Sequence, residues 1–201
     1  MNLRFQYNKT SLQALDKQLK MRVKAMPTLK NKESALRMEV KNARKKKQEL
    51  ADKLDTLISQ QEENLAMWNE FDDSLIEVSD VKLSHRKIAG VKIPQAEKVS
   101  FNEKEFDVFI RPKWFLDGLE TLKEMMRLVI EKKLVEEQQE MLEYARKKTT
   151  QKVNLYEKVQ IPAYEEAILK IKRFLEDEDN LAKAAQKIVK TRQQKTAKAG
   201  L

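Results

Sequence analysis

The chain has 201 residues, of which 36% are charged and 6% aromatic, with three glycines, four prolines and no cysteine. This composition is typical of long paired helices rather than of a thick globular core, and it excludes disulfides and thiolate metal sites. The chain has no apolar run of the about 18 residues that a membrane span needs, and the start MNLRFQYNKT has no signal-peptide core, so we expect a protein that is soluble or peripheral to something else.

Charge is unevenly distributed along the sequence. Residues 1–50 hold fourteen Lys and Arg against four Asp and Glu, whereas residues 51–80 hold nine Asp and Glu against one Lys. After Asp179 every charge is basic, and we call four of these residues the basic tip: Lys187, Lys190, Arg192 and Lys195. The basic residues alternate with leucines and lack interleaved aromatics, so we expect no nucleic-acid partner.

Residues 1–76 predict a first long helix, interrupted near Pro27. Its apolar residues step by three or four, which is the spacing of a coiled-coil seam. The stripe comprises Leu12, Leu15, Leu19, Val23, Met26, Leu29, Leu36, Val40, Ala43, Leu50, Leu54 and Leu57, and after a one-residue slip Leu65, Trp68, Phe71 and Leu75.

Residues 77–112 alternate apolar and polar side chains and predict a β-hairpin. We expect strands near 84–93 and 97–103 around a turn at residues 94–97. An isolated hairpin is marginally stable, so it should pack on the helices or on a partner. Aromatic residues gather near this insert, and either a small core or a partner surface would explain them: Trp68, Phe71, Phe101, Phe106, Phe109, Trp114 and Phe115.

Residues 113–201 predict a second long helix with a kink near Pro162 and a basic tail. Proline removes a helical donor and clashes with the carbonyl four residues before it. The apolar stripe of this second helix comprises Leu119, Leu122, Met126, Val129, Met141 or Leu142, Ala145, Val153, Tyr156, Val159, Tyr164, Ile168, Ile171, Leu175, Leu181, Ala185 and Ile188. The expected fold is therefore mainly α, a long antiparallel two-helix coiled coil with a small β-hairpin between its helices.

An antiparallel pair joined through a hairpin has a predictable register. Facing residues should have numbers that add to about 190, which places Pro27 beside Pro162. The same register places Lys45, Lys46 and Lys47 near Glu140 and Glu143.

Residues for catalysis are missing from the sequence. There is no Gly-rich phosphate loop, and the single histidine, His85, cannot form a multi-histidine metal site. The carboxylates lie along predicted helices without a concave pocket. We therefore expect no catalytic, cofactor-binding or metal site.

Three segments resemble the D subunit of the V-type and archaeal-type rotary ATPases. VNLYEKVQIPAYEEAILKIKRFLEDED is similar to the family's C-terminal signature, and PTLKNKESALRMEVKNARKKKQEL is similar to its N-terminal helix. IAGVKIP, with Ala89, Gly90, Val91 and Pro94, is similar to its mid-chain hairpin. The matching signature residues that the resemblance implies as partner contacts are Val153, Asn154, Glu157, Ile161, Pro162, Ile168 and Ile171. Leu175, Glu176 and Glu178 match the signature as well. The chain departs from the family at Ala163 and Asn180, where arginine is frequent.

The resemblance implies a non-catalytic central rotor shaft. Such a shaft couples ATP hydrolysis or synthesis in the catalytic ring to rotation and ion translocation. The implied partners are the catalytic A and the B subunits, the F subunit, and the funnel-shaped subunit on the membrane rotor ring, which makes the chain a peripheral part of the complex. A prefoldin-like coiled-coil chaperone and a basic coiled coil that binds nucleic acid are the alternatives.

Overall fold

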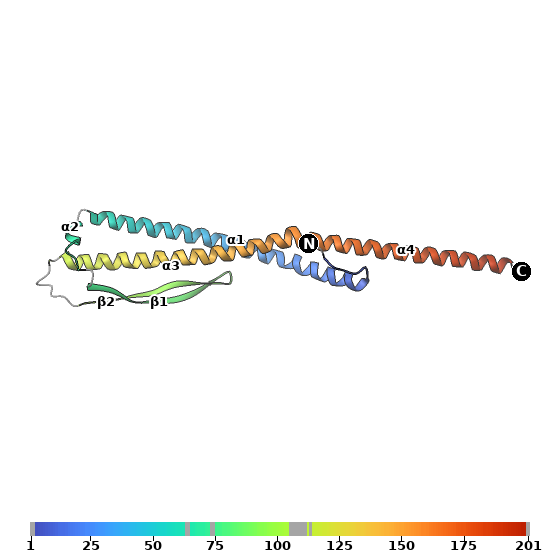
Figure 1. The fold of residues 1–201 in the computed structure, drawn as a ribbon, viewed down its shortest axis with the longest axis horizontal. Coiled ribbons are helices and arrows are strands. Elements are labelled where there is room, and N and C mark those ends of the chain that lie inside the picture. Colours follow the sequence, from blue (N-terminus) through green and yellow to red (C-terminus); the bar gives the residue numbers. More distant parts are fainter. Residues whose placement is uncertain (1–2, 63–64, 73–74, 105–111, 113, 200–201) are drawn as a thin grey trace. The chain divides into compact units, whose positions relative to one another are not determined.

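The computed structural model describes residues 3–62, 65–72, 75–104, 112 and 114–199 (Figure 1). The elements in chain order are α1 (Lys9–Gln61), α2 (Leu65–Trp68), β1 (Ile76–Ile88), β2 (Val91–Glu103), α3 (Trp114–Leu155), the π-helical turn η3 (Tyr156–Gln160) and α4 (Ile161–Ala199). The predicted fold class is confirmed: the molecule is mainly helical, with an antiparallel hairpin between a long N-terminal and a long C-terminal helix.

Two compact units divide the chain. Unit 1 contains Met1–Asn31 and Thr150–Leu201, and unit 2 contains Lys32–Thr149. Each unit therefore combines part of α1 with a helical segment from the second half of the sequence. The first long helix ends at Gln61, short of the predicted residue 76, at the place where the apolar stripe slips by one residue.

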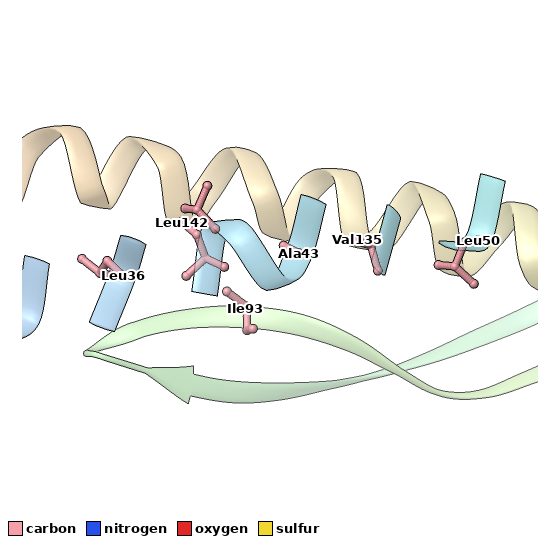
Figure 2. Packing of buried hydrophobic residues seen from close by; sticks show 7 residues of the cluster. Leu36, Ala43, Leu50, Ile93, Val135 and Leu142 are labelled. Carbon is pink, nitrogen blue, oxygen red and sulfur yellow. The ribbon is translucent and has the colours of Figure 1, made fainter. Parts of the chain in front are cut away.

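Unit 2 is built on an apolar seam between α1 and α3 that the hairpin covers. Its buried residues come from all three elements: Leu36, Val40, Ala43, Leu50, Ile93, Val135 and Leu142. Figure 2 shows Ile93 of β2 pointing toward the helices, between Leu142 of α3 and Ala43 of α1. The hairpin thus packs on the helices, as expected for a two-stranded sheet that is marginal alone.

The two-residue turn of the hairpin lies at Ala89–Gly90, not at residues 94–97 as predicted. Both turn residues have positive φ, 47° and 82°, which is the conformation that a tight hairpin turn requires and that glycine adopts without cost. Pro94 instead lies within β2, opposite His85. Its carbonyl accepts a bond from the Gln138 side chain of α3, so its nitrogen also points away from β1 and the missing N–H breaks no ladder bond.

Unit 1 pairs the first part of α1 with α4. The buried residues are Leu15 from α1 and Tyr164, Ala167, Ile168 and Ile171 from α4, and Leu3 and Phe5 pack against them. This apolar cluster extends along α4 only as far as Leu175.

Polar pairs across the helices establish an antiparallel direction within each unit. In unit 1, Arg22 bonds Gln160 and Lys30 pairs with Glu157. In unit 2, Arg44 pairs with Glu143, Lys47 with Glu136 and Lys46 with Glu131. The predicted partners of Lys46 and Lys47 are therefore wrong by a turn or more.

The two helix prolines lie about one helical turn apart along unit 1, close to their predicted alignment. Pro27 lies between Arg22 and Lys30, and the partners of both residues belong to η3, immediately before Pro162. α1 continues through Pro27 as one unbroken α-helix, contrary to the expected interruption.

A small aromatic core closes the α2 end of unit 2. The rings of Trp114 and Phe115 lie 4.7 Å apart, and those of Phe71 and Phe115 5.2 Å apart. Leu75 and Leu119 are buried beside them. Gly118 permits this packing, because a Cβ there would lie 3.3 Å from the Trp114 ring. Phe101 lies elsewhere, under Arg127, and Phe106 and Phe109 fall outside the described residues.

Leu36→Ala tests the seam of unit 2. Leu36 is fully buried, so its truncation should lower the free energy of unfolding by about 3 kcal/mol. Met38 on the same helix is 55% exposed, and Met38→Ala should change it by less than about 0.5 kcal/mol. Urea denaturation measures both values, and equal losses in the two variants would contradict the described seam.

The ion pair between Lys47 and Glu136 predicts a pH dependence. The Lys47 ammonium, through a hydrogen bond and charge attraction, holds the pKa of Glu136 below its ordinary value of 4.5. A lowered folded-state pKa contributes stability above the ordinary value, and this contribution is lost as pH falls through the folded-state value. Glu136→Gln should therefore reduce stability to urea at pH 7, and the difference from the parent chain should shrink as the pH falls below 4.5 and vanish once Glu136 is protonated in the folded chain. The exposed neighbour provides the control, Glu137→Gln, and a difference that persists in acid would contradict the assignment.

Candidate interaction surfaces

The π turn η3 separates α3 from α4 just before Pro162. Ile161 donates its N–H to the carbonyl of Tyr156, five residues back, and the residues on both sides keep right-handed helical angles. Pro162 has no N–H to give to the carbonyl of Lys158, and in a regular α-helix its ring would press on that carbonyl. The wider turn accommodates this proline. A kink near Pro162 stays a prediction.

Arg22 of α1 reaches across unit 1 to this turn. Its Nε donates to Oε1 of Gln160 at 2.7 Å, and its guanidinium carbon lies 4.5 Å from the ring centroid of Tyr164 and 5.9 Å from that of Tyr156. Sequence reasoning missed this cluster, although Tyr156 and Tyr164 were assigned to the seam. The available signal was the spacing of Tyr156, Gln160 and Tyr164, which are four residues apart on one helix face.

The residues of the C-terminal signature divide into two groups. Val153, Ile168 and Ile171 are buried, with Ile168 and Ile171 packing in the apolar cluster of unit 1. Ile161 is half-buried, while Asn154, Glu157 and Pro162 are exposed. Glu157 forms an ion pair with Lys30 at 2.7 Å. The exposed group therefore presents its side chains to solvent, whereas the buried group faces the interior.

The hairpin residues of interest lie at the end of the hairpin that contacts α1 and α3. Ala89 and Val91 pack against the core of unit 2, and Gly90 is exposed beside Lys32 of α1. Pro94 is half-buried through its contact with Gln138. In Figure 1 the two strands lie alongside α3.

The basic tip belongs to a long exposed stretch of α4. Every residue from Glu176 to Lys195 is exposed, including Lys187, Lys190, Arg192 and Lys195. Large apolar side chains lie among them: Leu181 is 72% exposed, Ile188 55% and Val189 54%. Figure 1 shows α4 continuing past the first turn of α1 to the C-terminus. The predicted stripe at Leu181, Ala185 and Ile188 therefore exists, but it lies in water rather than in a seam.

The described part of the chain has no cleft that is lined by residues suited to catalysis. A cleft of about 240 Å³ between β2 and α3 is lined half by apolar residues, and two of its polar residues, Lys46 and Glu131, form an ion pair. The described residues include no group of three or more His, Cys, Asp or Glu side chains that could hold a metal ion. None of the described helices is both long and apolar enough to cross a membrane.

Comparison with known proteins agrees with these features. The model of the family described as the ATP synthase D subunit matches residues 11–191. The V-type ATP synthase D subunit of Borreliella burgdorferi is 32% identical over 190 residues, which cover 91% of this chain and 92% of the relative. The D subunit of Chlamydia trachomatis serovar L2 is 26% identical over 186 residues, covering 88% and 90%, and that of Chlamydia muridarum is 23% identical over 184 residues, also covering 88% and 90%. A match across nearly the whole chain, in a molecule with two long helices around a hairpin, means that this protein belongs to the family of V-type ATP synthase D subunits.

Proposed function

We propose that this protein is the non-catalytic central rotor shaft of a V-type ATP synthase complex. In this role it transmits torque between the ring where ATP is hydrolysed or made and the ion-translocating part in the membrane. Family membership supports the assignment to the complex. The residues themselves support a mechanical role, because long paired helices are stiff.

The observation that carries the proposal is the uncovered half of α4. A helix of 20 exposed residues, Glu176 to Lys195, gains nothing from an internal seam, and isolated helices of this length are marginal in water. Burying a leucine or isoleucine side chain contributes about 1.5–3 kcal/mol, so Leu181 and Ile188 would favour a surrounding partner. In the proposed complex the ring of catalytic A and B subunits provides that surface.

The charge of unit 1 supports a shaft that rotates inside a ring of surrounding subunits. Unit 1 carries 18 Lys and Arg against 8 Asp and Glu. Unit 2 carries the other 23 Lys and Arg and the other 24 Asp and Glu. Both chain ends, including the basic tip, thus belong to a strongly positive unit. An excess of positive charge of this kind favours contact with acidic surfaces on a partner.

The remaining partners are assigned by the same proposal. The F subunit would bind beside the helix pair, and the funnel-shaped subunit would hold the base of the shaft on the membrane rotor ring. The chain would then be peripheral to the membrane on its cytoplasmic side, with no nucleic-acid partner. The exposed signature residues Asn154, Glu157 and Pro162 would face other subunits, and the hairpin end at Ala89, Gly90, Val91 and Pro94 would be a place where activity is tuned.

The double variant Leu181→Asp/Ile188→Asp tests the proposed ring contact. Co-expressed with the A, B and F subunits, it should reduce recovery of the stoichiometric assembly at least about tenfold, because two buried apolar contacts are replaced by charges. The variant should still fold, since neither residue belongs to the unit 1 core.

The matched control adds the same charge to the opposite face of the same helix. Gln186→Asp/Gln193→Asp lies more than 100° around the helix from Leu181 and Ile188, given about 100° per residue. Assembly by the control together with loss in the test variant supports the proposal, and full assembly by both variants would refute it.

The aligned prolines suggest that the shaft is eccentric, so that it presses differently on each surrounding subunit. Pro27→Ala/Pro162→Ala should then lower the torque and the coupling of a reconstituted motor, because both helices would regain the backbone donor that proline removes. Rotation of a single-molecule probe measures both quantities, and parental torque and coupling in the double variant would count against this role of the prolines.

A further inference from the structure

We propose that η3 is a compliant joint in the shaft and that Arg22 is the latch that sets its stiffness. With Arg22 in place, the π turn Tyr156–Gln160 is held against α1. Without it, the helix opens and twists at this turn. The effect of the joint on a rotating motor rests on the proposed function. The contacts of Arg22 with the π turn are a property of the free chain and can be tested without the complex.

The π turn is a weak point of its helix. π-helical turns are rare relative to α-helical ones, and here the following proline removes a donor that could close an ordinary turn. None of the residues of η3 is buried. The nearest buried residues are Val153 before the turn and Tyr164 after it. The apolar seam is therefore interrupted at this point, and polar contacts must hold the turn.

A single side chain supplies most of these contacts. Arg22 contacts the first residue of the turn through the Tyr156 ring, the last through Gln160, and the next helical turn through the Tyr164 ring. Tyr164 is 7% exposed and belongs to the apolar cluster of unit 1. Arg22 thus ties both ends of the π turn to the core that follows it.

The arginine is positioned by its own helix. Its Nη1 donates to the backbone oxygen of Gln18 at 3.0 Å and to Oε1 of Gln18 at 2.6 Å. A planar guanidinium can bond through its edge and stack through its face at the same time, which a lysine ammonium cannot do. The second cross-helix contact, Lys30–Glu157, joins side chains about half exposed to water, and pairs of this kind contribute little.

The joint explains how a stiff pair of helices could store and release twist. The turn is held by the hydrogen bond and ring contacts of Arg22 and by the exposed Lys30–Glu157 pair, and because none of its residues is buried it can open without exposing an apolar core. Pro27 removes a helical donor from α1 about one helical turn away along the unit. Torsional compliance is thereby confined to one turn of the second helix.

Hydrogen exchange of the full-length chain tests the latch. Arg22→Met keeps the aliphatic length but loses the bond to Gln160 and the ring contacts. Exchange of the amides of residues 157–165 should become about tenfold faster than in the parent chain. Arg22→Lys should give an intermediate rate, because it keeps the charge over the rings but not the two-sided geometry.

A control variant and the exchange of the rest of the chain show whether the effect of Arg22→Met is local. Arg37→Met is the control, since Arg37 is an exposed arginine of α1 that pairs with Glu33 on the same helix, and it should leave residues 157–165 unchanged. Unchanged exchange at residues 157–165 in Arg22→Met would overturn the latch. So would an equal acceleration over the whole chain, which would indicate general destabilisation.

The assembled complex tests the compliance. In a rotating motor that contains Arg22→Met, the angular spread of a probe on the shaft during pauses should widen about twofold, with the parent complex and Arg37→Met as references. An unchanged spread despite faster local exchange would overturn the joint. A parent complex that assembles without rotating would instead refute the proposed function and leave the exchange result to decide the latch.

Discussion

Burial of one apolar stripe of α1 against a second helix is the interaction on which the rest of the structure depends. Neither helix could remain stable in water with its stripe exposed, so the chain must return on itself. In unit 2 the seam is completed by the hairpin, whose Ile93 fills the space between the helices. In unit 1 the seam ends near Leu175, and the helix that continues beyond it is exposed. The proposed mechanical role rests on where this seam stops.

Periodicity predicted the elements well because helix and strand patterns differ clearly in this sequence. The stripe through Leu36, Val40 and Ala43 is buried as expected. In α3 the stripe was less certain: Leu142 rather than Met141 is buried, and Val135, which is 1% exposed, was missed within a run of lysines and glutamates. Burial there depends on the hairpin that covers α3, and no local pattern reports that contact.

The hairpin turn shows how a strong local signal can mislead. Proline at residue 94 suggested a turn, yet the chain turns at Ala89–Gly90, because a two-residue loop needs positive φ at both positions. Pro94 is accommodated in a strand by its outward-facing nitrogen. The candidate surfaces were only partly predictable for a related reason: family signature residues such as Ile168 and Ile171 serve the internal seam, whereas the Arg22 cluster depends on a register between distant segments.

Protection of α4 from hydrogen exchange, measured in the free chain and in the assembled complex, tests the central claim most directly. We expect strong protection of residues 162–175 in both samples, and rapid exchange of residues 180–195 in the free chain that slows on assembly. Uniform protection along α4 in the free chain, or continued rapid exchange of residues 180–195 in the complex, would contradict it.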